Sequence, residues 1–233
     1  MRRLLLLSNS TNHGGGYLDH AMPRVLEFLG AVRRIAFVPF ALRDHQAYTA
    51  KVRERFAREG VEVRGVSARS AEELDAAEAL FVGGGNTFRL LDELRRRELL
   101  DEIRGRVEAG TAYVGASAGT NVACPTIRTT NDMPIVEPRG GLDALGLVPF
   151  QINPHYLDPD PASGHMGETR EERIREYLEE NAFPVVGLRE GSWIAVEGGA
   201  GRLEGPRPAR LFRRGRDPEE LSPGADVLRA VAR

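Results

Sequence analysis

Short apolar runs, each followed by a polar or glycine-rich break, recur through the first half of the chain. These strand-sized runs are residues 3–8, 34–40, 61–66, 78–82 and 112–114. The stretches between them carry apolar residues at helical spacing, which predicts helices over 18–29, 48–59, 71–77, 88–100 and 100–110. The first run does not alternate between apolar and polar residues, which is typical of a strand buried on both faces of a parallel sheet. The alternation of strands and helices along the chain predicts a parallel sheet with right-handed crossovers and helices on both faces.

The second half of the chain is patterned less regularly. Residues 126–138 are polar with little periodicity, which favours a long functional loop. Further strands are expected at 145–150, 151–153, 184–188 and 192–196, and a helix at 170–181. The runs near 202–203 and 209–212 are expected to pair as an antiparallel hairpin, and the tail from 217 to contain a short helix. Because no repeat or linker interrupts the chain, we expect a single domain over 1–233. The expected class is a three-layer α/β sandwich with a mostly parallel sheet and short antiparallel strands near the C-terminus.

Composition narrows the choice of partners. Hydrophobic residues make up 41% and charged residues 28% of the 233 residues, as in ordinary soluble globular proteins. A formal net charge of −2 gives no basic field for nucleic acid or an anionic membrane, and no apolar run approaches the length of a membrane span. The single cysteine, Cys124, excludes an internal disulfide. We therefore expect a cytoplasmic protein without nucleic-acid or membrane partners, and the sequence leaves monomer and homodimer open.

A candidate nucleophile follows the apolar run at 112–114. Residues 115–119 read Gly-Ala-Ser-Ala-Gly, the G-x-S-x-G pattern of a sharp strand-to-helix turn that lifts Ser117 above a sheet. Glycines suit such a turn because a Cβ would clash where backbones approach closely. The N–H after the serine and the start of the helix could stabilise an oxyanion. Five small residues also suit an ordinary turn of an α/β protein, so the motif needs partners.

A serine nucleophile requires a base within hydrogen-bonding reach. His155 follows the strand-like run 150–154 and is therefore expected at the end of the sheet, where ligands bind in parallel α/β folds. The other histidines lie in the first two strand–helix units or in a glycine-rich loop: His13, His20, His45 and His165. The position of His155 makes it the favoured base.

Two acids could orient this histidine. Glu190 comes just after the expected strand at 184–188, and Asp132 lies in the long loop. Each also has an ordinary interpretation as turn chemistry. The order serine, histidine, acid that Glu190 would give differs from the order serine, acid, histidine of α/β-hydrolases. The residues alone leave both acids open and argue against an α/β-hydrolase.

Six segments, in chain order, resemble the peptidase E family, the serine-type α-aspartyl dipeptidases related to cyanophycinase. The tract 126–134, Thr-Ile-Arg-Thr-Thr-Asn-Asp-Met-Pro, is the most specific of them. The others are Gly-Gly-Gly-Asn-Thr at 83–87, the serine turn at 115–119, Asn-Pro-His at 153–155, Gly-Glu-Thr-Arg-Glu-Glu-Arg-Ile at 167–174 and Arg-Glu-Gly-Ser at 189–192.

The resemblance implies a class I glutamine-amidotransferase-like, flavodoxin-like fold with a serine nucleophile. It implies hydrolysis of dipeptides with N-terminal aspartate, Asp-Xaa, through an aspartyl-enzyme and without cofactor or metal. Carried over to this chain, Ser117 is the nucleophile, His155 the base and Glu190 the orienting acid. Gly85 and Ala118 would donate backbone N–H groups to the oxyanion.

Substrate recognition is expected on the same rim. A substrate aspartate calls for a guanidinium that binds its carboxylate, and Arg170 is the candidate; the alternative is that Arg170 is an ordinary solvated helix residue. Asn86, Thr130 and Asp132 lie on loops facing this rim, and Asp132 could neutralise the α-ammonium of the substrate. The alternatives are a cyanophycinase-like or isoaspartyl hydrolase and a non-catalytic small-molecule binder on the same fold.

Overall fold

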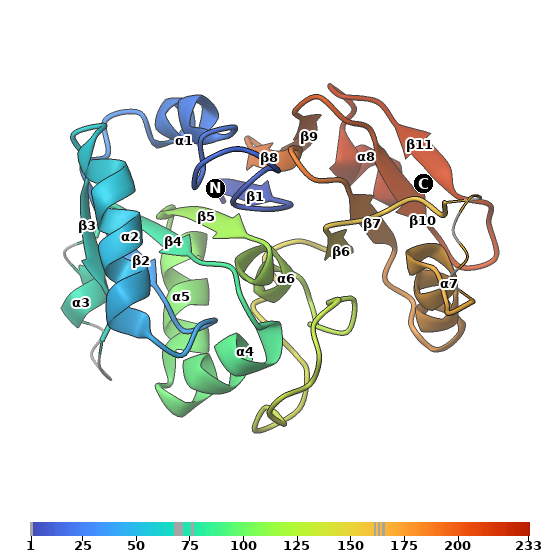
Figure 1. The fold of residues 1–233 in the computed structure, drawn as a ribbon, viewed down its shortest axis with the longest axis horizontal. Coiled ribbons are helices and arrows are strands. Elements are labelled where there is room, and N and C mark those ends of the chain that lie inside the picture. Colours follow the sequence, from blue (N-terminus) through green and yellow to red (C-terminus); the bar gives the residue numbers. More distant parts are fainter. Residues whose placement is uncertain (1, 68–71, 76, 161, 163, 165) are drawn as a thin grey trace.

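A computed structural model of the chain describes residues 2–67, 72–75, 77–160, 162, 164 and 166–233. Within these residues the main sheet has seven strands in the order β3-β2-β4-β5-β1-β8-β9 (Figure 1). The strands are β1 (Leu4–Leu7), β2 (Arg34–Val38), β3 (Glu62–Gly65), β4 (Ala79–Val82), β5 (Ala112–Ala116), β8 (Trp193–Glu197) and β9 (Ala200–Glu204). Neighbours from β3 to β1 are parallel, whereas β8 and β9 join antiparallel. The predicted mostly parallel α/β class is confirmed.

Helices cover both faces of the main sheet, which gives the predicted three layers. Leu5 and Leu7 of β1 pack with the apolar faces of α1 (Met22–Leu29) and α2 (His45–Ala57). Leu4 and Leu6 belong to the cluster on the opposite face. The helices contributing to that cluster are α3 (Glu72–Asp75), α4 (Thr87–Arg96), α5 (Leu99–Glu108), α6 (Ala118–Ala123) and α8 (Val227–Val231). The first strand is apolar throughout because both of its faces are buried.

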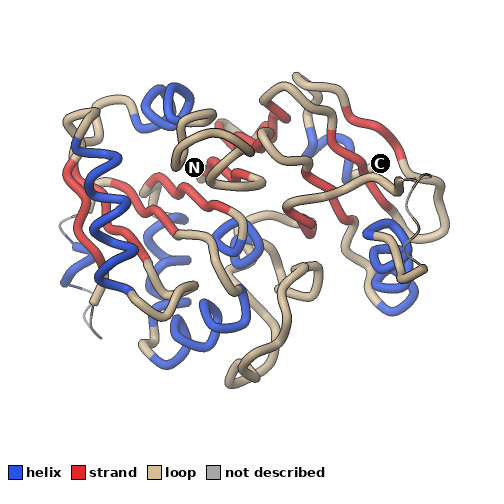
Figure 2. The backbone as a smooth tube through the Cα atoms, viewed as in Figure 1, coloured by secondary structure: helices blue, strands red, loops and turns tan. Residues whose placement is uncertain are grey.

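A smaller sheet lies beside the main one and carries part of the candidate site. Its order is β11-β10-β7-β6, and its strands gather on the right of the molecule in Figure 2. These strands are β6 (Gln151–Pro154), β7 (Val185–Leu188), β10 (Ala209–Phe212) and β11 (Glu219–Leu221). Apolar residues of α7 (Arg170–Glu180) pack with Val185 and Phe212, and α8 (Val227–Val231) lies against β9. Ile152 and Val186 share a core cluster with Leu4 and Leu6, so the two sheets have a continuous core.

The predicted hairpin of 202–203 with 209–212 is wrong. Strand β9 pairs with β8 in the main sheet, whereas β10 pairs with β7 and β11 in the smaller one. Between them, Gly205 has φ +99°, and the prolines at 206 and 208 cannot donate to a strand ladder. The chain therefore crosses from one sheet to the other instead of turning back. The charged edge strand β11 was not predicted.

The predicted strand at 145–150 is also wrong. This segment is irregular, and its apolar residues are buried because it packs against α6: Leu145 N–H donates to Val122 O and Leu147 N–H to Ala123 O, both at 2.9 Å. A short apolar run does not reveal by periodicity which structure buries it.

Other helices differ from the predictions mainly at their ends. Residues 18–21 form a turn before α1, and α2 begins at His45 because Asp44 caps it by accepting from Ala47 N–H at 2.8 Å. Ala71 and Ala76, within the predicted helix 71–77, lie outside the described residues. Among the described residues, each helix is too short or too polar to cross a bilayer.

Candidate active site

Ser117 occupies the predicted sharp turn, between β5 and α6. Its backbone has φ +52° and ψ −106°, a conformation that costs free energy in a residue with a side chain and that marks functional turns. Hydrogen bonds hold the turn in place: Ser117 N–H donates to Leu7 O at 3.1 Å, and the Thr120 hydroxyl donates to Leu7 O at 2.7 Å. The side chain is thus fixed at the carboxyl end of the main sheet.

The flanking glycines are needed because backbones meet at this turn. A Cβ on Gly115 would lie 2.6 Å from the carbonyl oxygen of Gly119, and a Cβ on Gly119 would overlap the carbonyl of Val82. Gly84, on the loop after β4, approaches Ser117 so closely that its Cβ would lie 3.2 Å from that of the serine. These contacts give the G-x-S-x-G pattern a steric cause.

His155 joins Ser117 and Glu190 through its two ring nitrogens. The Nε2 atom lies 2.9 Å from Ser117 Oγ, and Nδ1 lies 2.6 Å from Glu190 Oε1. An ionised carboxylate only accepts hydrogen bonds, so Nδ1 carries the proton and Nε2 is free to accept from the serine hydroxyl. The structure therefore brings together the three residues that the resemblance implied for catalysis.

The histidine and the acid come from the smaller sheet, immediately after β6 and β7. His155 has φ +53°, and its N–H donates to Ser8 Oγ at 2.9 Å while that hydroxyl donates to Leu188 O at 2.7 Å. Asn9 accepts from the Gly191 N–H at 2.8 Å, next to Glu190. Ser8 and Asn9, which follow β1, thus attach the ends of β6 and β7 to the main sheet.

Arg189 fixes the backbone on the other side of Glu190. Its buried guanidinium donates to Asp158 at 2.6 and 2.8 Å and to Glu220 at 2.9 and 3.0 Å. Hydrogen bonds from Arg189 lower the pKa of Asp158, three residues after His155, and burial opposes this shift only in part. The arginine therefore ties together the segments that follow His155 and precede Glu190.

Ser117 and His155 open into a cavity of about 670 Å³. The other lining residues come from the first two strand–helix units, the loop after β4 and the long loop: Ser10, Tyr17, Leu42, Asp44, Ala47, Tyr48, Lys51, Gly84, Gly85 and Asp132. Of the four residues predicted to bind substrate, Asp132 lines this cavity. Such a volume accommodates a small peptide.

The other two loop candidates support Asp132 from behind. Asp132 Oδ2 accepts from Thr87 N–H at 2.8 Å, from the Thr87 hydroxyl at 2.6 Å and from the Thr130 hydroxyl at 3.1 Å. Asn86 caps α4 by accepting from Arg89 N–H at 3.0 Å and donates to Met133 O at 2.9 Å. Asn86 and Thr130 thus form hydrogen bonds that hold the loop bearing Asp132.

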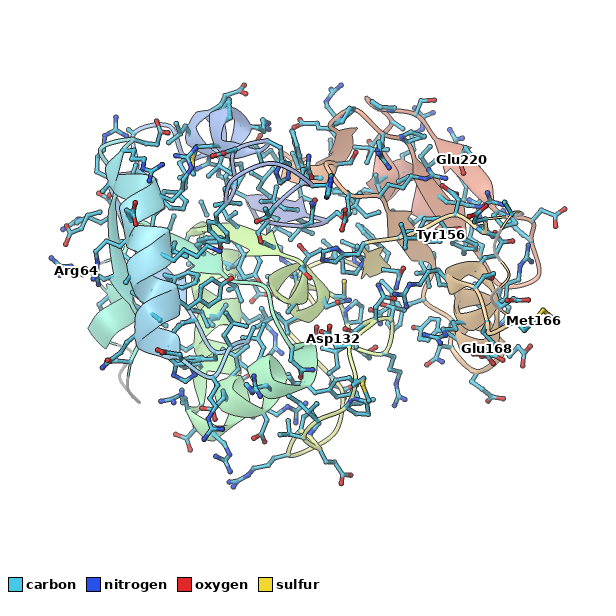
Figure 3. All side chains as sticks on the ribbon, viewed as in Figure 1. Arg64, Asp132, Tyr156, Met166, Glu168 and Glu220 are labelled. Atoms are coloured by element: carbon cyan, nitrogen blue, oxygen red, sulfur yellow. The ribbon has the colours of Figure 1, made fainter. Side chains whose placement is uncertain are left out.

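Arg170 is the first residue of α7 and lines a second cavity of about 360 Å³. Among the described residues it has no carboxylate within ion-pairing distance, yet Asp132 is near enough to act on it. Burial and Arg173 lower the pKa of Arg170, and the charge of Asp132 opposes them. In Figure 3, Asp132 lies beside α6, whereas Glu168, which lines the cavity of Arg170, lies outward beside α7. The structure therefore places Arg170 near the site but outside the cavity of Ser117.

The remaining histidines do not reach the serine where the structure describes them. The His45 ring packs 5.1 Å from the Phe40 ring, and the His20 ring lies 6.5 Å from Trp193. His13 is exposed in the loop after β1, and His165 lies outside the described residues.

Two groups of residues at this site were missed by the sequence reasoning. Ser8 could have been found, because it follows a buried strand at the sheet end where ligands bind. Tyr17, Tyr48 and Lys51 form a wall of the cavity, and the only available signal was that Lys51 is the single lysine of the chain.

Comparison with known proteins agrees with this geometry. The family model described as Peptidase family S51 matches residues 4–203. A protein named peptidase E from Streptomyces coelicolor is 61% identical over 96% of this chain and 93% of its own. A protein of Drosophila melanogaster named a probable alpha-aspartyl dipeptidase is 50% identical over 97% of this chain and 96% of its own. The crystal structure of a peptidase from an acI-B1 Actinobacterium shares the fold, with a TM-score of 0.70 at 16% identity over 97% of this chain and 96% of that one. The resemblance inferred from the motifs is thus confirmed, and the chain belongs to peptidase family S51.

Proposed function

We propose that this protein is a serine-type dipeptidase that hydrolyses dipeptides with N-terminal aspartate. The observation that carries the proposal is the hydrogen-bonded series Ser117, His155 and Glu190, with distances of 2.9 and 2.6 Å, at the wall of a cavity of peptide size. The names of relatives at 61% and 50% identity, peptidase E and alpha-aspartyl dipeptidase, support the same substrate class.

The reaction proceeds in two halves. His155 Nε2 takes the proton of Ser117 as the hydroxyl oxygen attacks the aspartyl carbonyl carbon, and the imidazolium then protonates the leaving amine. Water hydrolyses the aspartyl ester by the reverse sequence of proton transfers. Glu190 holds the Nδ1 proton and stabilises the imidazolium in both halves.

Backbone N–H groups of Gly85 and Ala118 stabilise the oxyanion. Ala118 is the first residue of α6 and carries one of the N–H groups that a helix leaves without an intrahelical acceptor. Gly85 has φ +136°, and a Cβ there would lie 2.7 Å from Ala41 O, so this peptide orientation requires glycine. Ala118 follows Ser117 directly and Gly85 lines the same cavity, where negative charge develops in the transition state.

Charges at one end of the cavity select the aspartyl residue. Asp132 pairs with the substrate α-ammonium, using the oxygen that its loop partners leave available. Arg170, without an ion-pairing partner in the described chain, binds the substrate side-chain carboxylate from the adjoining cavity. Asn86 and Thr130 act as positioning residues behind Asp132.

The test compares Asp-Leu, Glu-Leu and β-Asp-Leu with wild type and Ser117→Ala. We expect Asp-Leu to be the best substrate and the alanine variant to lose several orders of magnitude in kcat. His155→Ala should lose about as much, and the double variant little more, because the two side chains act together. Preference for β-Asp-Leu would replace the proposal by isoaspartyl hydrolysis. Failure of a fluorophosphonate to label wild type at Ser117 would replace it by simple binding.

Asp132→Asn tests the ammonium contact separately. The substitution is expected to raise KM for Asp-Leu about tenfold or more, since it removes a charge-assisted contact. A kcat/KM near that of wild type would refute the role of Asp132 and leave the role of Ser117 untouched.

A further inference from the structure

Within the part of the chain that the structure describes, the one lysine or arginine side chain that lines the cavity of Ser117 is chemically unusual for this chain. The chain has 32 lysine and arginine residues, and Lys51 is the only lysine. Most of the arginines hold carboxylates or carbonyl oxygens elsewhere, as Arg189 and Arg24 do. Lys51 has no carboxylate within 4.0 Å among the described residues, although it lines the cavity of Ser117. Its charge is therefore available to a ligand.

Two tyrosines connect Lys51 to the reaction centre. The Lys51 ammonium lies 4.7 Å from the centroid of the Tyr17 ring, a cation–π contact that holds the long side chain at the cavity wall. The Tyr17 hydroxyl lies 3.3 Å from that of Tyr48. The Tyr48 hydroxyl in turn lies against Gly83, where a Cβ would approach it to 2.7 Å, and the next residue, Gly84, contacts Ser117. A continuous wall thus runs from the serine to the ammonium.

This wall and Asp132 come from different elements around the same cavity. Lys51 and Tyr48 belong to α2, and Figure 1 shows α2 and the 126–138 segment on opposite sides of α6. Burial raises the pKa of both Tyr17 and Tyr48, so their hydroxyls stay neutral and can donate hydrogen bonds. Asp44, the acid at this end, uses its carboxylate to cap α2 through Ala47 N–H. The cavity therefore has a carboxylate and an ammonium on separate elements of its lining, Asp132 on the 126–138 segment and Lys51 on α2.

A free dipeptide has the opposite arrangement, with an α-ammonium at its first residue and an α-carboxylate at its second. We propose that Lys51, with the hydroxyl of Tyr17, binds the α-carboxylate of the leaving residue and so restricts the enzyme to substrates that end one residue beyond the scissile bond. The inference rests on the proposed dipeptidase function. It assigns Lys51 and Tyr17 to the second residue of the substrate, for which that function names no binding residue. The compact ammonium on a flexible stem suits a single carboxylate at a cavity wall, where the wider planar fork of arginine needs more room.

The role predicts a particular kinetic signature. The leaving carboxylate is already present in the ground state and keeps its charge through the transition state, so its contact contributes about equally to both. Losing it therefore raises KM and leaves kcat nearly unchanged. A substrate without that carboxylate should not respond to the loss.

The experiment compares three substrates with three variants. The substrates are Asp-Leu, its C-terminal amide Asp-Leu-NH2, and aspartyl p-nitroanilide, which has no second residue. The variants are Lys51→Met, Lys51→Arg and, as a matched control, Arg58→Met, which removes an exposed cation at the end of the same helix.

We expect wild type to bind Asp-Leu about tenfold better than its amide, which is the effect of a partly exposed charge-assisted hydrogen bond. Lys51→Met should raise KM for Asp-Leu to that of the amide, with kcat for all three substrates and KM for the amide and anilide within about twofold of wild type. Lys51→Arg should recover part of the loss, and Arg58→Met should have no effect. An unchanged ratio of Asp-Leu to amide in Lys51→Met, or an equal loss on the anilide, would overturn the role of Lys51 while wild-type turnover upholds the dipeptidase. Absence of wild-type turnover on all three substrates would instead refute the function itself and this inference with it.

Discussion

Ser117 stands on the main sheet, whereas His155 and Glu190 stand on the smaller one, and different forces hold the two. On the main sheet, every residue of β1 is fully buried and apolar, and the serine turn fits against its neighbours through glycine backbones. On the smaller sheet, the ends of β6 and β7 are held by ion pairs, with Arg189 between Asp158 and Glu220. Apolar packing neither titrates nor is screened by salt, whereas ion pairs both titrate and are screened.

This difference suggests a division of tasks between the sheets. The nucleophile and the oxyanion donors must be preorganised to within a fraction of an ångström, which close packing achieves. The base lines the cavity, and the side chains of the base and its acid are 39% and 44% exposed. Strands β6 and β7 are buried, but hydrogen bonds and ion pairs hold the residues that follow them.

The largest effect should come from a substitution in the closely packed serine turn of the main sheet. Gly119→Ala places a Cβ over the carbonyl of Val82, where only backbone could give way, so α6 must shift away from β4. We expect a loss of about 3 kcal/mol in the free energy of unfolding and at least about 100-fold in kcat/KM. Denaturant unfolding and Asp-Leu turnover measure the two losses.

Gly105→Ala is the matched control for this substitution. Gly105 lies within α5, and a Cβ added there would meet nothing within 4 Å. Alanine there should stabilise the protein by about 0.5–1 kcal/mol, because it favours the helix and restricts the unfolded chain. Equal behaviour of the two alanines would show that the serine turn is not held by close packing.

The contacts between the sheets should give the next largest effect. Ser8→Ala removes the hydroxyl that accepts from His155 N–H and donates to Leu188 O. Because Ser8 is fully buried, the loss should cost about 2 kcal/mol, and the freed His155 backbone should lower kcat by about 10- to 100-fold.

Thr129→Val separates stability from positioning. It also removes a buried hydroxyl, which donates to Ile152 O at 2.9 Å, but this hydroxyl does not contact Ser117, His155 or Glu190. A similar loss of stability with unchanged kcat is expected. If Ser8→Ala likewise kept full kcat, the contacts that Ser8 makes between the sheets would be structural only.

Much of the main sheet could be predicted from the sequence because its signals are local. The strand at Leu4–Leu7, the helices between strands and the serine turn each depend on a few neighbouring residues. The partners of strands β9 and β10 could not be predicted, since pairing depends on residues far apart in sequence, and a short apolar run fits several partners.

The residues of the site likewise divide into those with a local signal in the sequence and those without one. Ser117 was found from its motif and His155 from its position after a strand-like run. The choice of Glu190 over Asp132 required the resemblance to a family, because a sheet separate from that of Ser117 presents the acid. The Arg189 ion pairs and the wall around Lys51 were not found. An arginine or lysine in a polar segment predicts only a solvated side chain, and the fold alone determines which charges it meets.

The smallest of the three effects should be the one that depends on pH. Arg189→Met removes the guanidinium that holds Asp158 and Glu220, and with these carboxylates about half exposed it should cost about 1 kcal/mol at pH 7. Because Arg189 lowers the pKa of Asp158 in the folded state, this contribution is fully present above the unfolded pKa of about 4. It is lost as the pH falls through the lower folded value. The stability difference between wild type and Arg189→Met should therefore be constant from pH 7 to about pH 5 and shrink at lower pH.

The matched control for Arg189 is Arg213→Met, on the same small sheet. Arg213 pairs with Glu219 at 2.5 Å, away from the ends of β6 and β7. Arg213→Met should leave kcat unchanged. Arg189→Met should lower kcat about tenfold, because the segments bearing His155 and Glu190 lose the guanidinium that joins them. A pH-independent stability difference for Arg189→Met would contradict the ionic attachment of the smaller sheet. Apolar packing would then have to position the base as it positions the nucleophile, and the contrast between the two sheets would disappear.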